Sequence, residues 1–173
     1  MSFASRVTLV VLGLLLSACS TQSSQTDVKL SRTGSWVLLP LVNLAQAPQA
    51  AEGAEQILFS VLAANGLTVT PAPQQQQPAD EFPLEDSQRF QQALQWARQR
   101  GDTYAITGSV EEWQYKSGLD GEPAVGITLR VIEPASGRIL WSASAARAGW
   151  SRESLAGAAQ TVLESLVADL PLQ

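Results

Sequence analysis

The chain has 173 residues, a formal net charge of −5, no histidine and a single cysteine. The acidic balance argues against nucleic acid as a partner, because nucleic-acid-binding domains carry basic patches. The missing histidine excludes Ser-His-Asp and Cys-His nucleophiles and the usual zinc ligand, so we expect neither a metal site nor a metal cofactor.

Residues 1–18 have the zones of an export signal. Arg6 supplies a positive charge, and residues 7–16 are mostly apolar. An apolar run of about ten residues is too short to span ~30 Å of hydrocarbon, but it suits the central region of a signal peptide. The segment ends in a tetrapeptide that resembles the lipobox of bacterial lipoprotein precursors, Leu16-Ser17-Ala18-Cys19.

Cys19 is therefore expected to carry covalent lipid as the first residue of the mature protein, with no other cofactor. An ordinary signal peptide followed by a chance cysteine is the alternative. Ser20, where Asp would favour the inner membrane, favours the periplasmic face of the outer membrane. Residues 19–34 are too polar to order themselves and are expected to form a flexible tether. Residues 35–173 then suit one periplasmic domain.

The first half of this domain is expected to alternate strands and helices. Residues 36–42 are an apolar run typical of a buried strand, in which Pro40 indicates an edge, an end or a bulge. Apolar residues at helical spacing over 54–62 predict a helix, with Pro48 in its first turn and Gly66 after its last residue.

A second strand and a second helix follow. Residues 67–70 predict a short strand, and residues 71–82, with four consecutive glutamines, predict a loop. The next helix is expected over 85–100 and ends at Gly101. Its inward residues are expected to be Phe90, Ala93, Leu94 and Ala97.

The second half changes from helical spacing to alternation. Three alternating segments predict three strands in a row, with Ile139, Trp141 and Ala143 on one face of the third. Short turn-forming segments between the strands predict an antiparallel meander. Its connections are the tip at 116–122 and the turn at 133–137.

A last helix is predicted over 152–169, with Ser151 as its N-cap. The element order is then β-α-β-α-β-β-β-α. This order predicts an α/β fold, a two-layer sandwich with a mixed sheet, an antiparallel C-terminal meander and helices mainly on one face.

Segments of the C-terminal half carry a resemblance to a known family. They are residues 104–113, 121–126, 136–142 (Ser-Gly-Arg-Ile-Leu-Trp-Ser) and 149–151 (Gly-Trp-Ser). With them the chain resembles the PelC family, the outer-membrane lipoproteins of Pel exopolysaccharide export. More distantly it is similar to the periplasmic domain of CsgG-type secretion lipoproteins.

The resemblance implies a protein without enzymatic activity. Members of the family form a dodecameric ring, a homo-oligomer, beneath an outer-membrane β-barrel exporter. The resemblance further implies an acidic surface around the opening that funnels a cationic polysaccharide destined for the biofilm matrix. A tryptophan from each copy contacts outer-membrane lipid.

Two residues, Asp120 and Trp150, take site roles from this resemblance, and Glu122 joins the funnel as the neighbour of Asp120. Asp120, with Glu122 beside it, matches the acidic position of the polymer funnel, although Asp120 in a Leu-Asp-Gly tip is also an ordinary turn former. Trp150 matches the membrane-contacting tryptophan. Alternatively, Trp150 packs on Leu155 as a hydrophobic staple before the last helix, and the two roles of Trp150 exclude each other.

Two other functions remain open from the residues. A lipoprotein activator of a peptidoglycan synthase can use a similar tethered domain, although such activators generally need a longer tether. An enzyme acting on envelope glycans would need converging carboxylates. Glu111 and Glu112 are adjacent in a predicted strand and are expected to point to opposite faces, so they do not provide such a pair.

Overall fold

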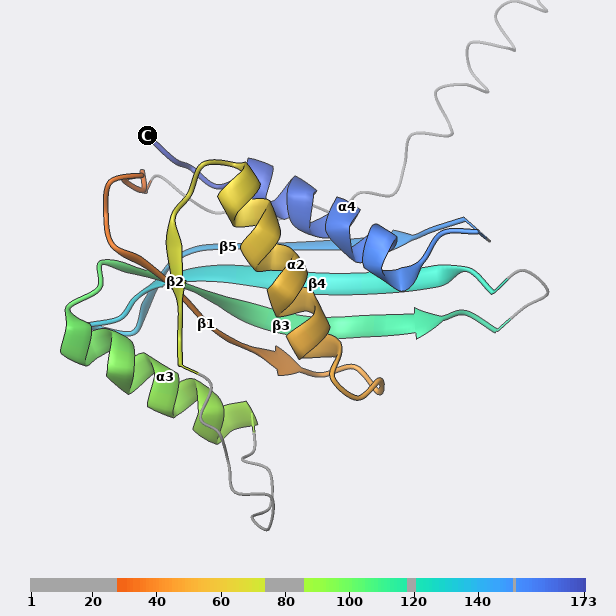
Figure 1. The fold of residues 1–173 in the computed structure, drawn as a ribbon, viewed down its shortest axis with the longest axis horizontal. Coiled ribbons are helices and arrows are strands. Elements are labelled where there is room, and N and C mark those ends of the chain that lie inside the picture. Colours follow the sequence, from red (N-terminus) through yellow and green to blue (C-terminus); the bar gives the residue numbers. More distant parts are fainter. Residues whose placement is uncertain (1–27, 74–85, 118–120, 151) are drawn as a thin grey trace, which may run out of the picture.

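The computed structural model describes residues 28–73, 86–117, 121–150 and 152–173 (Figure 1). The elements in chain order are β1 (Trp36–Asn43), α2 (Ala50–Ala64), β2 (Val69–Pro71), α3 (Asp86–Arg100), β3 (Tyr104–Tyr115), β4 (Pro123–Glu133), β5 (Arg138–Ala148) and α4 (Leu155–Ala168). This order confirms the predicted β-α-β-α-β-β-β-α arrangement.

The strands form one mixed sheet in the order β2-β1-β3-β4-β5. β1 pairs in parallel with both β2 and β3. β3, β4 and β5 pair antiparallel in sequence, which confirms the predicted meander. The long strands β3 to β5 extend together toward one end of the molecule (Figure 1).

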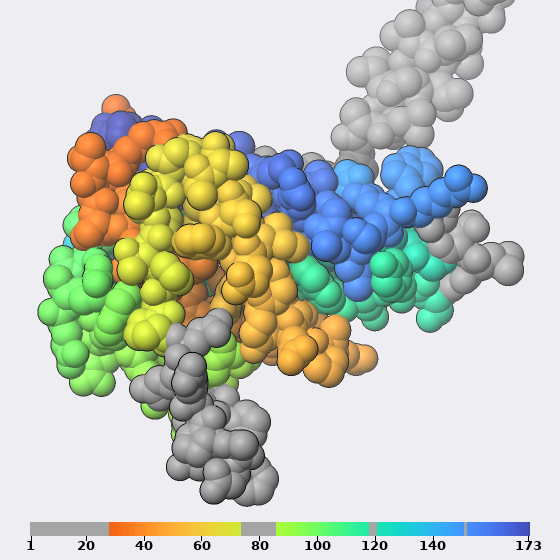
Figure 2. Space-filling view, viewed as in Figure 1, coloured from red at the N-terminus to blue at the C-terminus, as the bar shows by residue number. Residues whose placement is uncertain are grey.

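Two helices cover one face of the sheet. α2 and α4 lie side by side across it (Figure 2) and enclose the main core. α3 packs on the opposite face, mainly against β1, over a smaller cluster that includes Val37, Leu39, Ala93, Leu94, Ala97 and Ala105. The predicted sandwich with helices mainly on one face is confirmed, and α3 adds partial cover to the other face.

Pro40 produces a bulge in a central strand. The pairing of β1 with β3 changes register between Leu38, opposite Ile106, and Leu41, opposite Gly108. Proline has no N–H to donate, so the ladder is interrupted where it sits. The Pro40 carbonyl instead accepts the Thr107 hydroxyl at 2.9 Å. Of the three predicted settings for Pro40, the structure selects the bulge.

A second bulge corrects the predicted alternation of β5. The pairing of β4 with β5 changes register so that Val131 faces Trp141 while Ile132 faces Ile139, leaving Leu140 as the extra residue. Leu140 and Trp141 both belong to the main core, whereas Ile139 is 56% exposed. The prediction is therefore right for Trp141 and wrong for Ile139.

The helix boundaries differ from prediction at two N-termini. α2 begins at Ala50, two residues after Pro48, so Pro48 precedes the helix rather than lying in its first turn. Gly66, at φ 74°, follows the helix as predicted. α4 begins at Leu155 rather than near residue 152, and its N-cap is Ser154, not Ser151.

The ordered domain begins earlier than residue 35. Leu30 is fully buried, its N–H donates to the Pro171 carbonyl at 2.9 Å, and its carbonyl accepts the Gln173 N–H at 3.0 Å. Residues 28–34 therefore belong to the fold rather than to the tether.

Residues 1–27, which include Cys19, lie outside the described residues, as does 74–85 of the glutamine-rich segment. Within the described ranges, no helix is long and apolar enough to cross a membrane.

Candidate functional site

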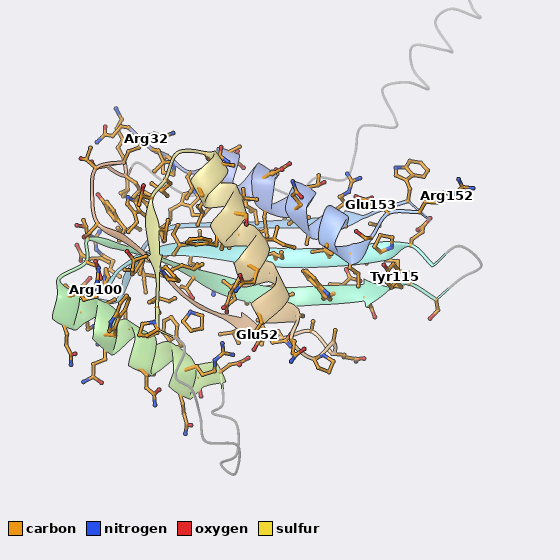
Figure 3. All side chains as sticks on the ribbon, viewed as in Figure 1. Arg32, Glu52, Arg100, Tyr115, Arg152 and Glu153 are labelled. Carbon is orange, nitrogen blue, oxygen red and sulfur yellow. The ribbon has the colours of Figure 1, made fainter. Side chains whose placement is uncertain are left out.

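Two of the predicted site residues, Glu122 and Trp150, lie at the end of the molecule where β3 stops and β4 starts. The segment 149–154, between β5 and α4, lies at the same end. Figure 3 places Tyr115 and Glu153 here, far from Arg100 at the opposite end. The Gly149 N–H donates to the Pro123 carbonyl at 2.7 Å, which ties the segment to the first residue of β4.

Trp150 projects from this segment and is 79% exposed. A hydrophobic staple joins the residue before the N-cap to the fourth helical residue. Because the N-cap is Ser154, those positions belong to Glu153 and Ala158. The staple interpretation of Trp150 is therefore wrong, and the membrane contact stays a prediction.

The backbone around Trp150 is fixed by a carboxylate that the sequence analysis missed. Oε2 of Glu153 accepts the Trp150 N–H at 3.3 Å and lies 3.2 Å from a terminal nitrogen of Arg147. These bonds hold Trp150 and Glu153 outside the helix, which explains why α4 starts later than predicted. Arg147 and Glu153 are six residues apart and follow no local spacing rule, so the sequence offered little signal for the pair.

Two acidic residues were predicted to face the polymer. Glu122 is exposed, and its carbonyl accepts the Lys116 N–H at 2.7 Å, which closes the base of the β3–β4 tip. Asp120 lies outside the described residues, so its place in the funnel is untested. The structure thus brings Glu122 and Trp150 to the same end of the molecule.

The two adjacent glutamates of β3 differ from expectation. The register of β3 against β4 changes between Val110 and Glu112, which makes Glu111 a bulged residue and interrupts the alternation. Glu111 accepts the hydroxyl of Ser109 at 2.6 Å, on the sheet face opposite α2 and α4. The Cβ of Glu112 lies beside Gly126 on that same face. The prediction that the two side chains point to opposite faces is therefore wrong.

The aromatic residues of β3 have structural partners. Trp113 is partly buried and packs against the main core. Tyr115 is 52% exposed, and its hydroxyl accepts the N–H of Leu155, the first residue of α4, at 3.4 Å. The start of α4 is therefore tied both to β3 and to the segment carrying Trp150.

A second group of ionisable residues lies beside the C-terminal end of β1, on α2 and α3. Glu55 of α2 is buried, and its carboxylate accepts the Leu41 N–H at 2.8 Å. Burial raises the pKa of the Glu55 carboxyl, while this hydrogen bond and the charge of Arg89 act in the opposite direction. Arg89 also lies 2.9 Å from Glu52 and 3.4 Å from Asp86. No cluster of acidic residues suited to a metal ion occurs in the part of the chain that the structure describes.

Comparisons with known proteins place this architecture in a family. Neither the protein-family models nor the curated proteins contain a match. Among solved structures, the chain is similar to a PelC dodecamer from Paraburkholderia phytofirmans, with 31% identity over 90% of this chain and 99% of that one, at a TM-score of 0.73. A single-substitution variant of the same dodecamer matches with the same identity and TM-score and is covered completely.

A more distant structure supports the fold alone. The lipoprotein GNA1162 from Neisseria meningitidis is 18% identical, covers 78% of this chain and is itself covered over 96%, at a TM-score of 0.54. The two PelC structures, in contrast, combine 31% identity with nearly full coverage of both chains. On that similarity, with the matching order of strands and helices, this protein belongs to the PelC family.

Proposed function

We propose that this protein is a non-enzymatic component of a Pel-type exopolysaccharide exporter, anchored by lipid on Cys19 to the periplasmic face of the outer membrane. The observation that carries the proposal is the 31% identity to PelC over 90% of the chain. Those relatives are dodecamers, and we extend a homo-oligomeric ring to this chain. An outer-membrane β-barrel exporter would receive the polymer from the ring.

In this proposal, the symmetry of a ring gives the two carboxylates of the β3–β4 tip their function. One exposed carboxylate in water attracts a cation only weakly. A ring would repeat Glu122, and Asp120 with it, once in every subunit around one opening. The summed field attracts a cationic polysaccharide at a distance, while no single tight site prevents the chain from moving on.

Trp150 gives the same end a second role. A ring of exposed indoles meets the headgroup region of a bilayer favourably, because indole is apolar in its body and polar at its N–H. Trp150 is 79% exposed, which supports this role, because an indole buried within the fold could not contact lipid. Lipid contact and polymer attraction would then occur at adjacent positions.

The first experiment measures assembly and then export. Native mass spectrometry of the lipidated protein in detergent should show a ring of uniform copy number. Glu122→Lys and Asp120→Lys should each reduce secreted polymer, and the double variant should reduce it further. Glu164→Lys is the matched control, because Glu164 is an exposed carboxylate on α4 that bonds only Gln160 of its own helix.

Two results would contradict the proposal. A monodisperse monomer at high concentration would remove the ring and the summed field, and it would favour the synthase-activator alternative. An equal loss of polymer with Glu164→Lys would show that the effect of charge reversal is not confined to the predicted opening.

A further inference from the structure

The exposed indole of Trp150 stands on a backbone that the fold holds in place. We infer that Glu153 is the positioning residue of the membrane contact, presenting Trp150 to the lipid surface in a preformed orientation. This inference rests on the membrane contact in the proposed function. It adds a residue that would act without touching lipid itself.

One carboxylate joins the segment that carries Trp150 to β5. Glu153 accepts the Trp150 N–H at 3.3 Å through Oε2. The same carboxylate receives two bonds from one Arg147 nitrogen, at 3.2 and 3.5 Å. Arg147 belongs to β5, so the ion pair fastens the segment that carries Trp150 to the sheet.

This ion pair is partly shielded from water. The side chains of Arg147 and Glu153 are only 37% and 21% exposed. Nε of Arg147 is buried and has no hydrogen-bond partner among the described residues. With Glu153 removed, the half-buried guanidinium loses its counter-charge, and the Trp150 N–H loses its acceptor.

The close packing around Gly149 also indicates that the Glu153 carboxylate has a defined position. A Cβ on Gly149 would overlap Oε2 of Glu153 and would lie 2.8 Å from Cγ of Pro123. Only glycine leaves room for the carboxylate to reach both partners. Gly149→Ala should therefore displace the Glu153 carboxylate without changing its charge.

A fixed presentation helps a lipid contact for an entropic reason. A mobile loop loses conformational freedom when its tip enters the headgroup region, and that loss opposes binding. The backbone of Trp150 has already lost this freedom in the fold. Each subunit of a ring would then present its indole in the same direction.

The experiment uses the mature lipidated protein in two settings. In liposomes containing brominated phosphatidylcholine, the quenching of tryptophan emission that disappears in Trp150→Phe reports the contact of Trp150 with acyl chains. In detergent micelles, hydrogen exchange of peptides covering residues 147–154 reports the backbone of the segment without requiring any membrane contact.

We expect graded effects. Glu153→Ala should reduce Trp150-specific quenching roughly twofold or more and accelerate exchange at the Trp150 amide about tenfold, as expected for losing one charged hydrogen bond. Glu153→Gln keeps an acceptor oxygen and should be intermediate. Gly149→Ala should resemble Glu153→Ala, while Glu164→Ala should match the wild type in both measurements.

The outcomes distinguish the positioning role of Glu153 from the proposed membrane contact of Trp150. Wild-type quenching and exchange in Glu153→Ala would overturn the positioning role while leaving the membrane contact intact. Absence of Trp150-specific quenching in the wild type would overturn the membrane contact, whatever the exchange data show. Thermal unfolding of each variant, followed by circular dichroism, identifies any loss that comes from global destabilisation.

Discussion

Glu55→Ala removes the acceptor from a buried main-chain donor next to the bulge of β1. The Leu41 N–H, which donates to Glu55 at 2.8 Å, belongs to a fully buried residue. A buried donor left without a partner costs about 1–3 kcal/mol. We therefore expect Glu55→Ala to lower the free energy of unfolding by about 2 kcal/mol, which corresponds to a fall of about 4–8 °C in Tm for a domain of this size.

Glu55→Gln separates the hydrogen bond from the charge. The amide oxygen of glutamine can still accept the Leu41 N–H, while the buried negative charge is gone. Because burial raises the pKa of the Glu55 carboxyl above its ordinary value of 4.5, the folded state binds the proton more tightly than the unfolded state. The stability linked to this proton is complete below pH 4.5 and is lost as the pH rises through the raised pKa. Relative to wild type, Glu55→Gln should thus gain stability between acid and neutral pH.

The assay is urea unfolding of the mature protein in detergent at pH 4 and pH 7.5, followed by far-ultraviolet circular dichroism. Protein concentration is held constant, because assembly stabilises the folded state by mass action. The reasoning would be refuted if Glu55→Ala unfolded at the wild-type midpoint. It would also be refuted if Glu55→Gln lost stability, relative to wild type, on going from pH 4 to pH 7.5.

Two further substitutions test the cap of α4 and the close packing of the sheet. Ser154→Ala removes the side-chain acceptor of the N-cap and should lower the free energy of unfolding by about 1 kcal/mol. The exposed Ser165→Ala on the same helix should change it by less than about 0.5 kcal/mol, and equal effects would contradict the cap assignment. Gly108→Ala should prevent accumulation of folded protein, because a Cβ there overlaps the carbonyl oxygen of Thr128 in β4. Gly126→Ala, whose Cβ would have no neighbour closer than 3.4 Å, should express in folded form; similar yields of the two variants would argue against so close an approach of β4 to Gly108.

The fold was largely predictable because its elements differ in their hydrophobic period. α2 and the meander of β3 to β5 carry clear helical and alternating patterns, and Gly66 and Gly101 mark helix ends with positive φ. The errors come from contacts between residues distant in the chain. Leu30 is one apolar residue in a polar stretch, and its burial depends on pairing with the far C-terminus.

The candidate site was less predictable for the same reason. The exposure of Trp150 depends on where α4 begins, and Ser151 and Ser154 are equally good caps by residue type alone. The choice between them follows from the bonds of Glu153 to Trp150 and Arg147, which are tertiary. The bulge at Glu111 likewise depends on pairing with β4, so a strict period of two could not reveal it.

The pairing of Leu30 with Leu172 also limits how the domain can stand on a membrane. This pairing lies beyond the C-terminal end of α4, whereas Trp150 lies before its N-terminal end, and the 14 residues of α4 span ~21 Å at ~1.5 Å each. Cys19 and Val28 are nine residues apart, a stretch that reaches ~32 Å at most when fully extended. If Cys19 carries lipid and the Trp150 end contacts the bilayer, as proposed, these nine residues have to cover at least the length of α4, and only ~10 Å of their reach is left over. So short a connection would restrict how far each subunit can lift or tilt and would hold the domain near one orientation on the membrane.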